Sequence, residues 1–303
     1  MVLPLSMNPP AAAQGALAVE IADGRPDLEK LLKKINSADT FACVQEERAI
    51  LKSYGGGCHQ KIGVSLLMKK TGKLKTLRGL TDSGEVLNSH ELAIEELNWP
   101  KTKSTQIFPL HESDNSWFER ENIPFANVTA DAFWVARADA WPKDHVFKGK
   151  AVWTSGLSSW KKLAKMGVWV NGCAENLGQE DPRLDALIGR QSKWVKLTHN
   201  SVLEVDPGMP TVATYKLKPK DAGASPDLHG RTHFFWLSGT SFQRARDLFP
   251  QEIESGYHAC GPGLTYKFLC EQKLKNPPRV FLNLQAFLKA ITEIRPSETP
   301  NIS

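Results

Sequence analysis

An internal repeat in the second half of the chain constrains its fold more than any other feature. The segment Ala151–Trp160 (AVWTSGLSSW) parallels Phe234–Phe242 (FFWLSGTSF), and further along Asn171–Ala174 parallels His258–Gly261. We interpret each copy as a buried strand, a Ser-Gly turn, a helix and a second strand, because self-similarity along a chain indicates repeated supersecondary units. Such βα units stack into parallel sheets flanked by helices, so the sequence predicts an α/β region here.

The two Ser-Gly pairs of this repeat are candidate anion sites. Ser155-Gly156 and Ser238-Gly239 each follow an apolar run. A helix that begins there exposes backbone N–H groups at its N-terminus, where carboxylates bind well. Ligands of open α/β sheets bind beyond the carboxyl ends of the strands, so the two copies predict a cleft with matched substrate-binding turns. Ordinary helix capping by the two serines remains an equally good interpretation.

A run of glycines precedes a cysteine in the first third of the chain. Gly55, Gly56 and Gly57 follow the helix-like run Glu46–Leu51 and come directly before Cys58. Glycine tolerates positive φ and has no Cβ to crowd an adduct, so these residues could hold a thiol on a tight turn beside a bound group. The alternative is a helix C-cap followed by a cysteine that packs as a small hydrophobe.

The region around this turn predicts a small α+β domain, with helices against a short antiparallel sheet. Leu28, Leu31, Leu32 and Ile35 share one helical face, and Thr71-Gly72 is a hairpin signal between two strand-like runs. The predicted elements are a helix over Asp27–Ile35, a helix from near Asp39 to the glycines, strands over Ile62–Lys69 and Leu74–Leu80, and a helix over His90–Leu97.

Length and patterning predict two domains. The chain has 303 residues, of which 41% are hydrophobic and 23% are charged, as in ordinary globular proteins. The pattern loosens between about Lys101 and Ala130. We therefore predict an α+β domain over residues 1–105, a linker over 106–130 and an α/β domain over 131–303.

Charge and cysteine usage exclude several classes of partner. The net charge of +5, without a concentrated basic run, does not predict nucleic-acid binding but suits an acidic small molecule. The five cysteines have no CxxC spacing, which indicates reduced thiols and no metal site. No apolar run approaches a membrane span, and the N-terminus lacks a basic region typical of a signal peptide. We expect a cytoplasmic protein with no membrane partner.

The first region resembles the last third of porphobilinogen deaminase (hydroxymethylbilane synthase). The resemblance rests on the order and spacing of Pro10–Glu20, Glu47-Arg48-Ala49, Gly56-Gly57-Cys58 and Ile62-Gly63. In that family the cysteine of this turn forms a thioether to a dipyrromethane primer. The resemblance therefore implies a dipyrromethane cofactor on Cys58, with Gly56 and Gly57 beside it.

That family binds its primer and substrate through arginines and an aspartate on two further domains, which would precede Pro10. The resemblance thus implies that loading of Cys58 depends on a separate polypeptide carrying the N-terminal deaminase domains. We expect a split enzyme, and the alternative is a relic that serves as a docking module.

Residues Ala132–Ile294 resemble a second family, uroporphyrinogen-III synthase. The likeness lies in Val212–Leu217, in His233–Phe242 and in the Gly-Pro turn of Ala259–Thr265. It implies an α/β uroporphyrinogen-III synthase-like region of repeated βα units. By the same resemblance, Tyr215 is the candidate catalytic side chain, and Gly261 and Thr265 are candidate substrate-binding residues.

Both resemblances point to tetrapyrrole (haem) biosynthesis. The expected substrate is hydroxymethylbilane, a linear tetrapyrrole with eight carboxylates, and the expected reaction is its cyclisation to uroporphyrinogen III. Catalysis of this kind depends on positioning and on amide contacts to carboxylates. The alternative is a non-catalytic scaffold that binds the bilane or the deaminase N-terminal polypeptide.

Overall fold

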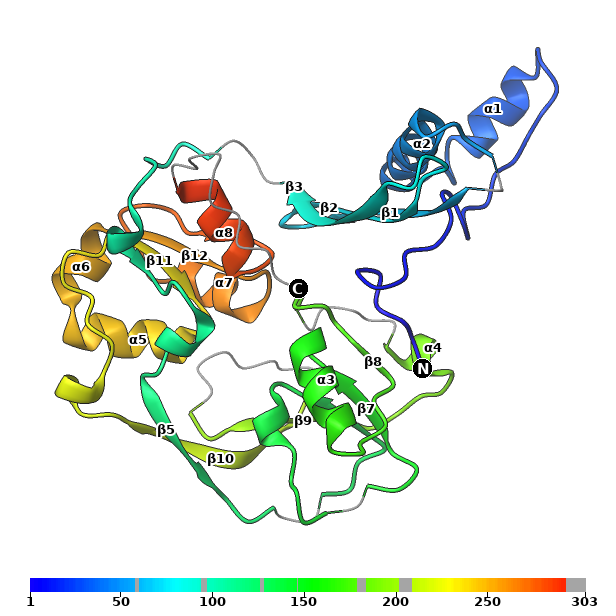
Figure 1. The fold of residues 1–303 in the computed structure, drawn as a ribbon. Helices are drawn as coiled ribbons and strands as arrows, with labels where there is room; N and C mark the ends of the chain where they lie inside the picture. The colour runs from blue at the N-terminus through cyan, green and yellow to red at the C-terminus, as the bar shows by residue number, and fades with distance from the viewer. Residues whose placement is uncertain are drawn as a thin grey trace. The chain divides into compact units, whose positions relative to one another are not determined.

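The computed structural model describes residues 1–57, 60–93, 97–125, 128–145, 147–178, 184–201 and 209–292. The chain divides into two compact units, Leu3–Glu95 and Met1–Val2 with Glu96–Ser303 (Figure 1). Helices and sheets occur in both, as expected for a chain of mixed α and β structure. The predicted linker, residues 106–130, contains two strands. None of the described helices is both long and apolar enough to span a bilayer.

The unit Leu3–Glu95 contains two helices and a three-stranded sheet. The elements are α1 (Pro26–Leu32), α2 (Ala38–Ser53), β1 (Lys61–Lys69), β2 (Gly72–Leu80) and β3 (Val86–Ala93). The sheet is an antiparallel meander in the order β1-β2-β3. Its core joins Cys43 of α2 to Val64 and Leu66 of β1 and to Leu77 of β2. The hairpin between β1 and β2 is confirmed, with Lys69 opposite Gly72.

The predicted helix over His90–Leu97 is wrong for the described residues. His90 and its neighbours to Ala93 belong to β3, where His90 pairs with Thr76 of β2. The imidazole Nδ1 of His90 also lies 2.8 Å from the Thr76 hydroxyl. Pairing with a neighbouring strand here overrides the helix propensity of the Glu-Leu-Ala sequence, which is a weak preference.

The helix α1 is present but buries none of its residues. Leu31 is 56% exposed, and Ile35, beyond the end of α1, is 75% exposed. The preceding segment is also open, with Leu17 99% and Val19 64% exposed. These residues place an apolar surface on the outside of the unit, which soluble proteins use for binding when such residues lie together.

The unit that includes Glu96–Ser303 contains two sheets. The six-stranded sheet has the order β5-β10-β9-β6-β7-β8, in which β5 is antiparallel to β10 and the other neighbours are parallel. The four-stranded sheet is parallel, in the order β13-β12-β11-β4. The strands are β4 (Ile107–Phe108), β5 (Phe118–Asn122), β6 (Ala132–Val135), β7 (Ala151–Thr154), β8 (Gly172–Cys173), β9 (Trp194–His199), β10 (Thr211–Pro219), β11 (His233–Trp236), β12 (Tyr257–Cys260) and β13 (Arg279–Val280). The helices are α3 (Leu157–Lys165), α4 (Leu184–Ile188), α5 (Gly239–Leu248), α6 (Pro250–Ser255), α7 (Leu264–Cys270) and α8 (Leu284–Ile291).

The predicted repeat is confirmed as a pair of βα units. One copy runs β7-α3-β8 and the other runs β11-α5-α6-β12, and in each copy the two strands are parallel neighbours. All four residues of β7 and of β11 are buried, as for strands covered on both faces. Alternation sends successive side chains to opposite cores, so Phe133 and Trp134 of β6 belong to different clusters.

Candidate functional site

The glycine turn follows directly from the end of α2. Gly55, Gly56 and Gly57 have φ values of +101°, +66° and +95°, a region that favours glycine. The N–H of Gly56 donates to the Leu51 carbonyl at 3.1 Å, which caps the helix. The helix C-cap interpretation therefore holds for these glycines. Cys58 lies outside the described residues, so its role as the cofactor-bearing thiol stays a prediction.

The first Ser-Gly turn lies at the carboxyl end of β7. Gly156 is the N-cap of α3, and among the described residues Ser155 makes no side-chain cap to this helix. Asn176 covers the turn: its N–H donates to the Ser155 carbonyl at 2.7 Å. A Cβ on Gly156 would meet the Asn176 side-chain oxygen at 2.2 Å. The absence of a side chain at Gly156 thus leaves room for Asn176 at the start of α3.

The second Ser-Gly turn lies at the carboxyl end of β11 and differs from the first. The Ser238 hydroxyl accepts from the Ser241 N–H at 3.1 Å, so Ser238 caps α5. Gly239 is buried in the first turn of that helix. The helix-capping interpretation therefore explains Ser238, while Ser155 makes no such cap among the described residues.

This difference predicts different costs for two similar substitutions. We expect Ser238→Ala to lower the free energy of unfolding by about 1 kcal/mol, because a cap is lost. For Ser155→Ala we expect the free energy of unfolding to fall by less than about 0.5 kcal/mol, because no cap is lost. Urea titrations followed by tryptophan fluorescence measure both, since all nine tryptophans lie after Glu96. Equal losses for the two variants would contradict the assignment.

Two contacts join the carboxyl edges of the two sheets. The Thr240 hydroxyl, in the first turn of α5, donates to the Ser201 carbonyl beyond β9 at 3.1 Å. A Cβ on Gly263, beyond β12, would lie 3.2 Å from the Cα of Gly178, beyond β8. The predicted Gly261 stands at the end of β12 beside this approach. Thr265, the second residue of α7, is half-buried.

Tyr215 is only 1% exposed and lies in the core of the six-stranded sheet. It stands opposite His199 of β9, with the ring centroids 5.7 Å apart. Burial raises the pKa of Tyr215, against the opposing effects of Arg137 and Arg120. The hydroxyl therefore keeps its proton at neutral pH, which is the form that can donate one.

A charged cluster surrounds Tyr215 at the carboxyl ends of β6 and β9. Arg120 of β5 forms an ion pair with Asp139 at 3.5 Å, and Arg137 lies just beyond the end of β6, after Ala136. Burial, together with Lys196, Arg120 and Arg137, lowers the pKa of His199 to about 4, so this imidazole is neutral at pH 7. Both arginine side chains can bind carboxylates.

Sequence reasoning missed Arg120, Arg137 and His199. Arg137 could have been found from the sequence, because it comes shortly after the buried apolar run of β6, much as Ser155 comes after that of β7. Arg120 gave no signal, since it lies in a strand, FEREN, that is mostly charged and is defined only by its pairing with β10.

The described residues thus define a small α+β unit and a two-sheet α/β unit. In the second unit, Arg120 and Arg137 lie near Tyr215 at the carboxyl ends of β6 and β9, and we call this place the cationic strand edge. No family model matches the chain. One region is similar to curated porphobilinogen deaminases. That of Neisseria meningitidis serogroup A is 44% identical over 80 residues, which is 26% of this chain and 25% of the relative. That of Nitrosomonas europaea is 40% identical over 63 residues (21% and 20%). That of Clostridium novyi is 39% identical over 79 residues (26% and 26%). The chain therefore spans about a quarter of the length of these relatives.

Proposed function

We propose that the chain acts in tetrapyrrole biosynthesis and that its unit Leu3–Glu95 supplies Cys58 to a hydroxymethylbilane synthase. The observation that carries the proposal is the 44% identity to a porphobilinogen deaminase over 80 residues. The matched region is about a quarter of such an enzyme, and activity of that kind would require the other deaminase domains as well. We propose a separate polypeptide as its source.

The glycine turn supports the proposed cofactor. Three successive residues without a Cβ, all at positive φ, contribute no side chain to the turn that leads to Cys58. Bound to the Cys58 sulfur as a thioether, a dipyrromethane would supply the primer for pyrrole addition. In this proposal, the residues of the chain hold the thiol just beyond the end of α2, and the glycines keep side chains away from it.

The exposed apolar residues of the same unit support a partner polypeptide. Leu17, Val19, Leu31, Ile35 and Phe41 are between 55% and 99% exposed. Burial of apolar surface stabilises an interface by about 25 cal/mol per Å². A partner that covers these residues would stabilise both chains, and the proposal assigns the other deaminase domains to that role.

Intact mass tests the deaminase part of the proposal. We expect the chain purified from its native host to carry an added mass of about two pyrrole units, and the chain made alone in a foreign host to lack it. Cys58→Ser should abolish the addition, whereas Cys270→Ser, which removes an exposed thiol elsewhere in the chain, should retain it. An unmodified chain from the native host would overturn the proposal that Cys58 carries the cofactor. The alternative, that the unit Leu3–Glu95 is a docking module, would then be favoured.

We propose further that residues 131–303, together with the strand β5 that carries Arg120, cyclise hydroxymethylbilane to uroporphyrinogen III. The cationic strand edge favours this activity, because Arg120 and Arg137 suit a substrate with many carboxylates. Tyr215 would assist the departing hydroxyl by donating a proton. Ser155, Gly156, Ser238, Gly239, Gly261 and Thr265 would bind substrate carboxylates at the strand ends. The competing proposal is a scaffold that binds the bilane, or the deaminase N-terminal polypeptide, without catalysis.

The product isomer separates these two proposals. Hydroxymethylbilane is supplied to the purified full chain, and the isomers are separated by chromatography. The enzyme is expected to form uroporphyrinogen III, and Tyr215→Phe should slow this about 100-fold, the usual contribution of a general acid. Tyr257→Phe, at another strand tyrosine, is the matched control. If only the isomer that forms spontaneously is found, the enzyme proposal is overturned and the scaffold proposal is favoured.

A further inference from the structure

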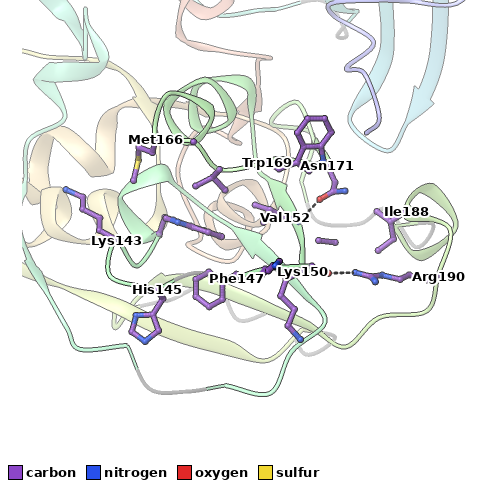
Figure 2. A pocket seen from close by; sticks show the side chains of 16 residues that line it. Lys143, His145, Phe147, Lys150, Val152, Met166, Trp169, Asn171, Ile188 and Arg190 are labelled. Carbon is purple, nitrogen blue, oxygen red and sulfur yellow. Dashed lines mark hydrogen bonds between the residues drawn. The ribbon is translucent and has the colours of Figure 1, made fainter.

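A hollow of about 860 Å³ opens at the edge of the six-stranded sheet opposite to the strand-end turns (Figure 2). Its walls come from the start of β7 and the segment before it, from the loop between α3 and β8, and from the end of α4 with Arg190 beyond it. All three lead into the amino ends of parallel strands. Ligands of α/β sheets usually bind at the carboxyl ends, so this hollow is separate from the candidate site described above.

The charge of the hollow has one sign. Lys143, Lys148, Lys150 and Arg190 line it, and none of the other described lining residues is an aspartate or glutamate. Within the described part of the chain, none of these four side chains takes part in an ion pair. Unpaired cations around one concave surface raise the local concentration of anions.

Aromatic rings form the apolar part of the same hollow. The indole of Trp141 packs on Phe147 with centroids 4.9 Å apart, and Phe147 packs on Phe133 of the core at 4.5 Å. This wall is therefore backed by fixed rings. Trp169, by contrast, is 67% exposed and belongs to the same lining. An exposed indole beside a cavity can stack on a flat ligand.

Two further polar groups belong to the lining of the hollow. The Nδ1 atom of His145 is buried and has no hydrogen-bond partner among the described residues. A buried polar atom of this kind is costly unless a ligand or water satisfies it. The guanidinium of Arg190 donates to the Gly149 carbonyl at 3.3 Å, which holds it at the rim (Figure 2).

We propose that this hollow binds a planar aromatic polyanion. The ring of the ligand stacks on Trp169, and its acidic groups lie against Lys148, Lys150 and the other cations. Each exposed charge pair contributes little alone, so several acidic groups are needed. The inference does not depend on the proposed function, because it concerns the opposite edge of the sheet.

Titration calorimetry of the full chain with pyrenetetrasulfonate tests the site. We expect saturable binding that weakens with salt. Trp169→Ala should weaken it about tenfold, as expected for one stacking contact. Lys148→Gln/Lys150→Gln should weaken it by a similar factor and reduce the salt dependence. Lys161→Gln/Lys289→Gln, which removes two exposed lysines outside the hollow, should leave the affinity unchanged.

Two further probes define the ligand. Tripolyphosphate, which has no ring, should bind more weakly and be insensitive to Trp169→Ala. Uroporphyrin I, a planar octacarboxylate, should displace pyrenetetrasulfonate from the hollow. Uroporphyrin I binding without displacement would overturn the inference and place its binding elsewhere on the chain. Absence of saturable pyrenetetrasulfonate binding, or binding that Trp169→Ala leaves unchanged, would overturn the inference.

Discussion

Lowering the pH from 6.5 to 4 is expected to destabilise the unit that includes Glu96–Ser303, because His258 is buried there in its neutral form. The side chain is fully buried, and burial lowers its pKa to about 4. The indole N–H of Trp236 donates to Nδ1 of His258 at 3.0 Å. Nδ1 must therefore be unprotonated, and Nε2 donates to the Ile253 carbonyl at 2.8 Å.

The direction of the effect follows from proton binding. An unfolded histidine has a pKa of about 6.5, so between pH 6.5 and 4 the unfolded chain binds a proton that the folded chain does not. The stabilisation is complete above pH 6.5 and is lost as the pH falls to about 4. For His258 it amounts to up to about 3 kcal/mol. The lowered pKa values of His199 and His233 act in the same direction.

Urea unfolding at pH 7 and pH 5, followed by tryptophan fluorescence, measures this dependence. All nine tryptophans lie after Glu96, so the signal reports this unit. His258→Gln keeps one hydrogen-bond donor and one acceptor but does not titrate, so the change in unfolding free energy between the two pH values should shrink. His111→Gln, at an exposed histidine, is the control. An unchanged pH dependence in His258→Gln would contradict the assignment.

The repeated βα units could be predicted because their strands are buried on both faces. Such strands appear in the sequence as continuous apolar runs, as in β7 and β11, and the Ser-Gly pairs mark their ends. The hairpin between β1 and β2 was predictable for a related reason, since Gly72, at φ +135°, marks a position that favours glycine.

Elements that depend on distant pairing could not be predicted. The strand β3 has the composition of a helix, and only its pairing with β2 makes it extended. The strand β5 is mostly charged and exists through its antiparallel pairing with β10, supported by an ion pair between Glu121 and Lys218. Local sequence carries no information about such partners.

The same reason explains what was missed at the candidate site. Arg120 and Tyr215 are far apart in the sequence and meet only because β5 and β10 are neighbours. The burial of Tyr215 also depends on this pairing. The exposed face of α1 was a different failure: helical spacing of apolar residues predicts a covered face, and within the described structure Leu31 stays open.

Replacement of Glu47 by alanine is expected to destabilise the unit Leu3–Glu95 by about 3 kcal/mol, because two backbone N–H groups lose a charged acceptor. Glu47 lies in α2 and is 8% exposed. Its carboxylate accepts from the Leu66 N–H of β1 at 2.7 Å and from the Ala13 N–H at 2.8 Å. One side chain therefore joins the helix, the sheet and the N-terminal segment.

Glu46→Ala is the matched control at the adjacent position. Glu46 is half-exposed and pairs with Lys73, so its loss should cost less than about 1 kcal/mol. Glu47→Gln keeps one acceptor oxygen and should lie between the two variants. Hydrogen exchange of the Leu66 amide, read by mass spectrometry, reports this unit specifically. Equal exchange rates in the Glu46→Ala and Glu47→Ala variants would contradict the prediction.

This interaction also connects stability to the proposed cofactor. The helix α2 that carries Glu47 ends at Ser53, one residue before Gly55–Gly57. If α2 separates from β1, the glycine turn loses its fixed support. We therefore expect Glu47→Ala, but not Glu46→Ala, to reduce the fraction of chain that carries the added mass in the native host. A reduced fraction in both variants would indicate a general effect of charge and not the loss of this support.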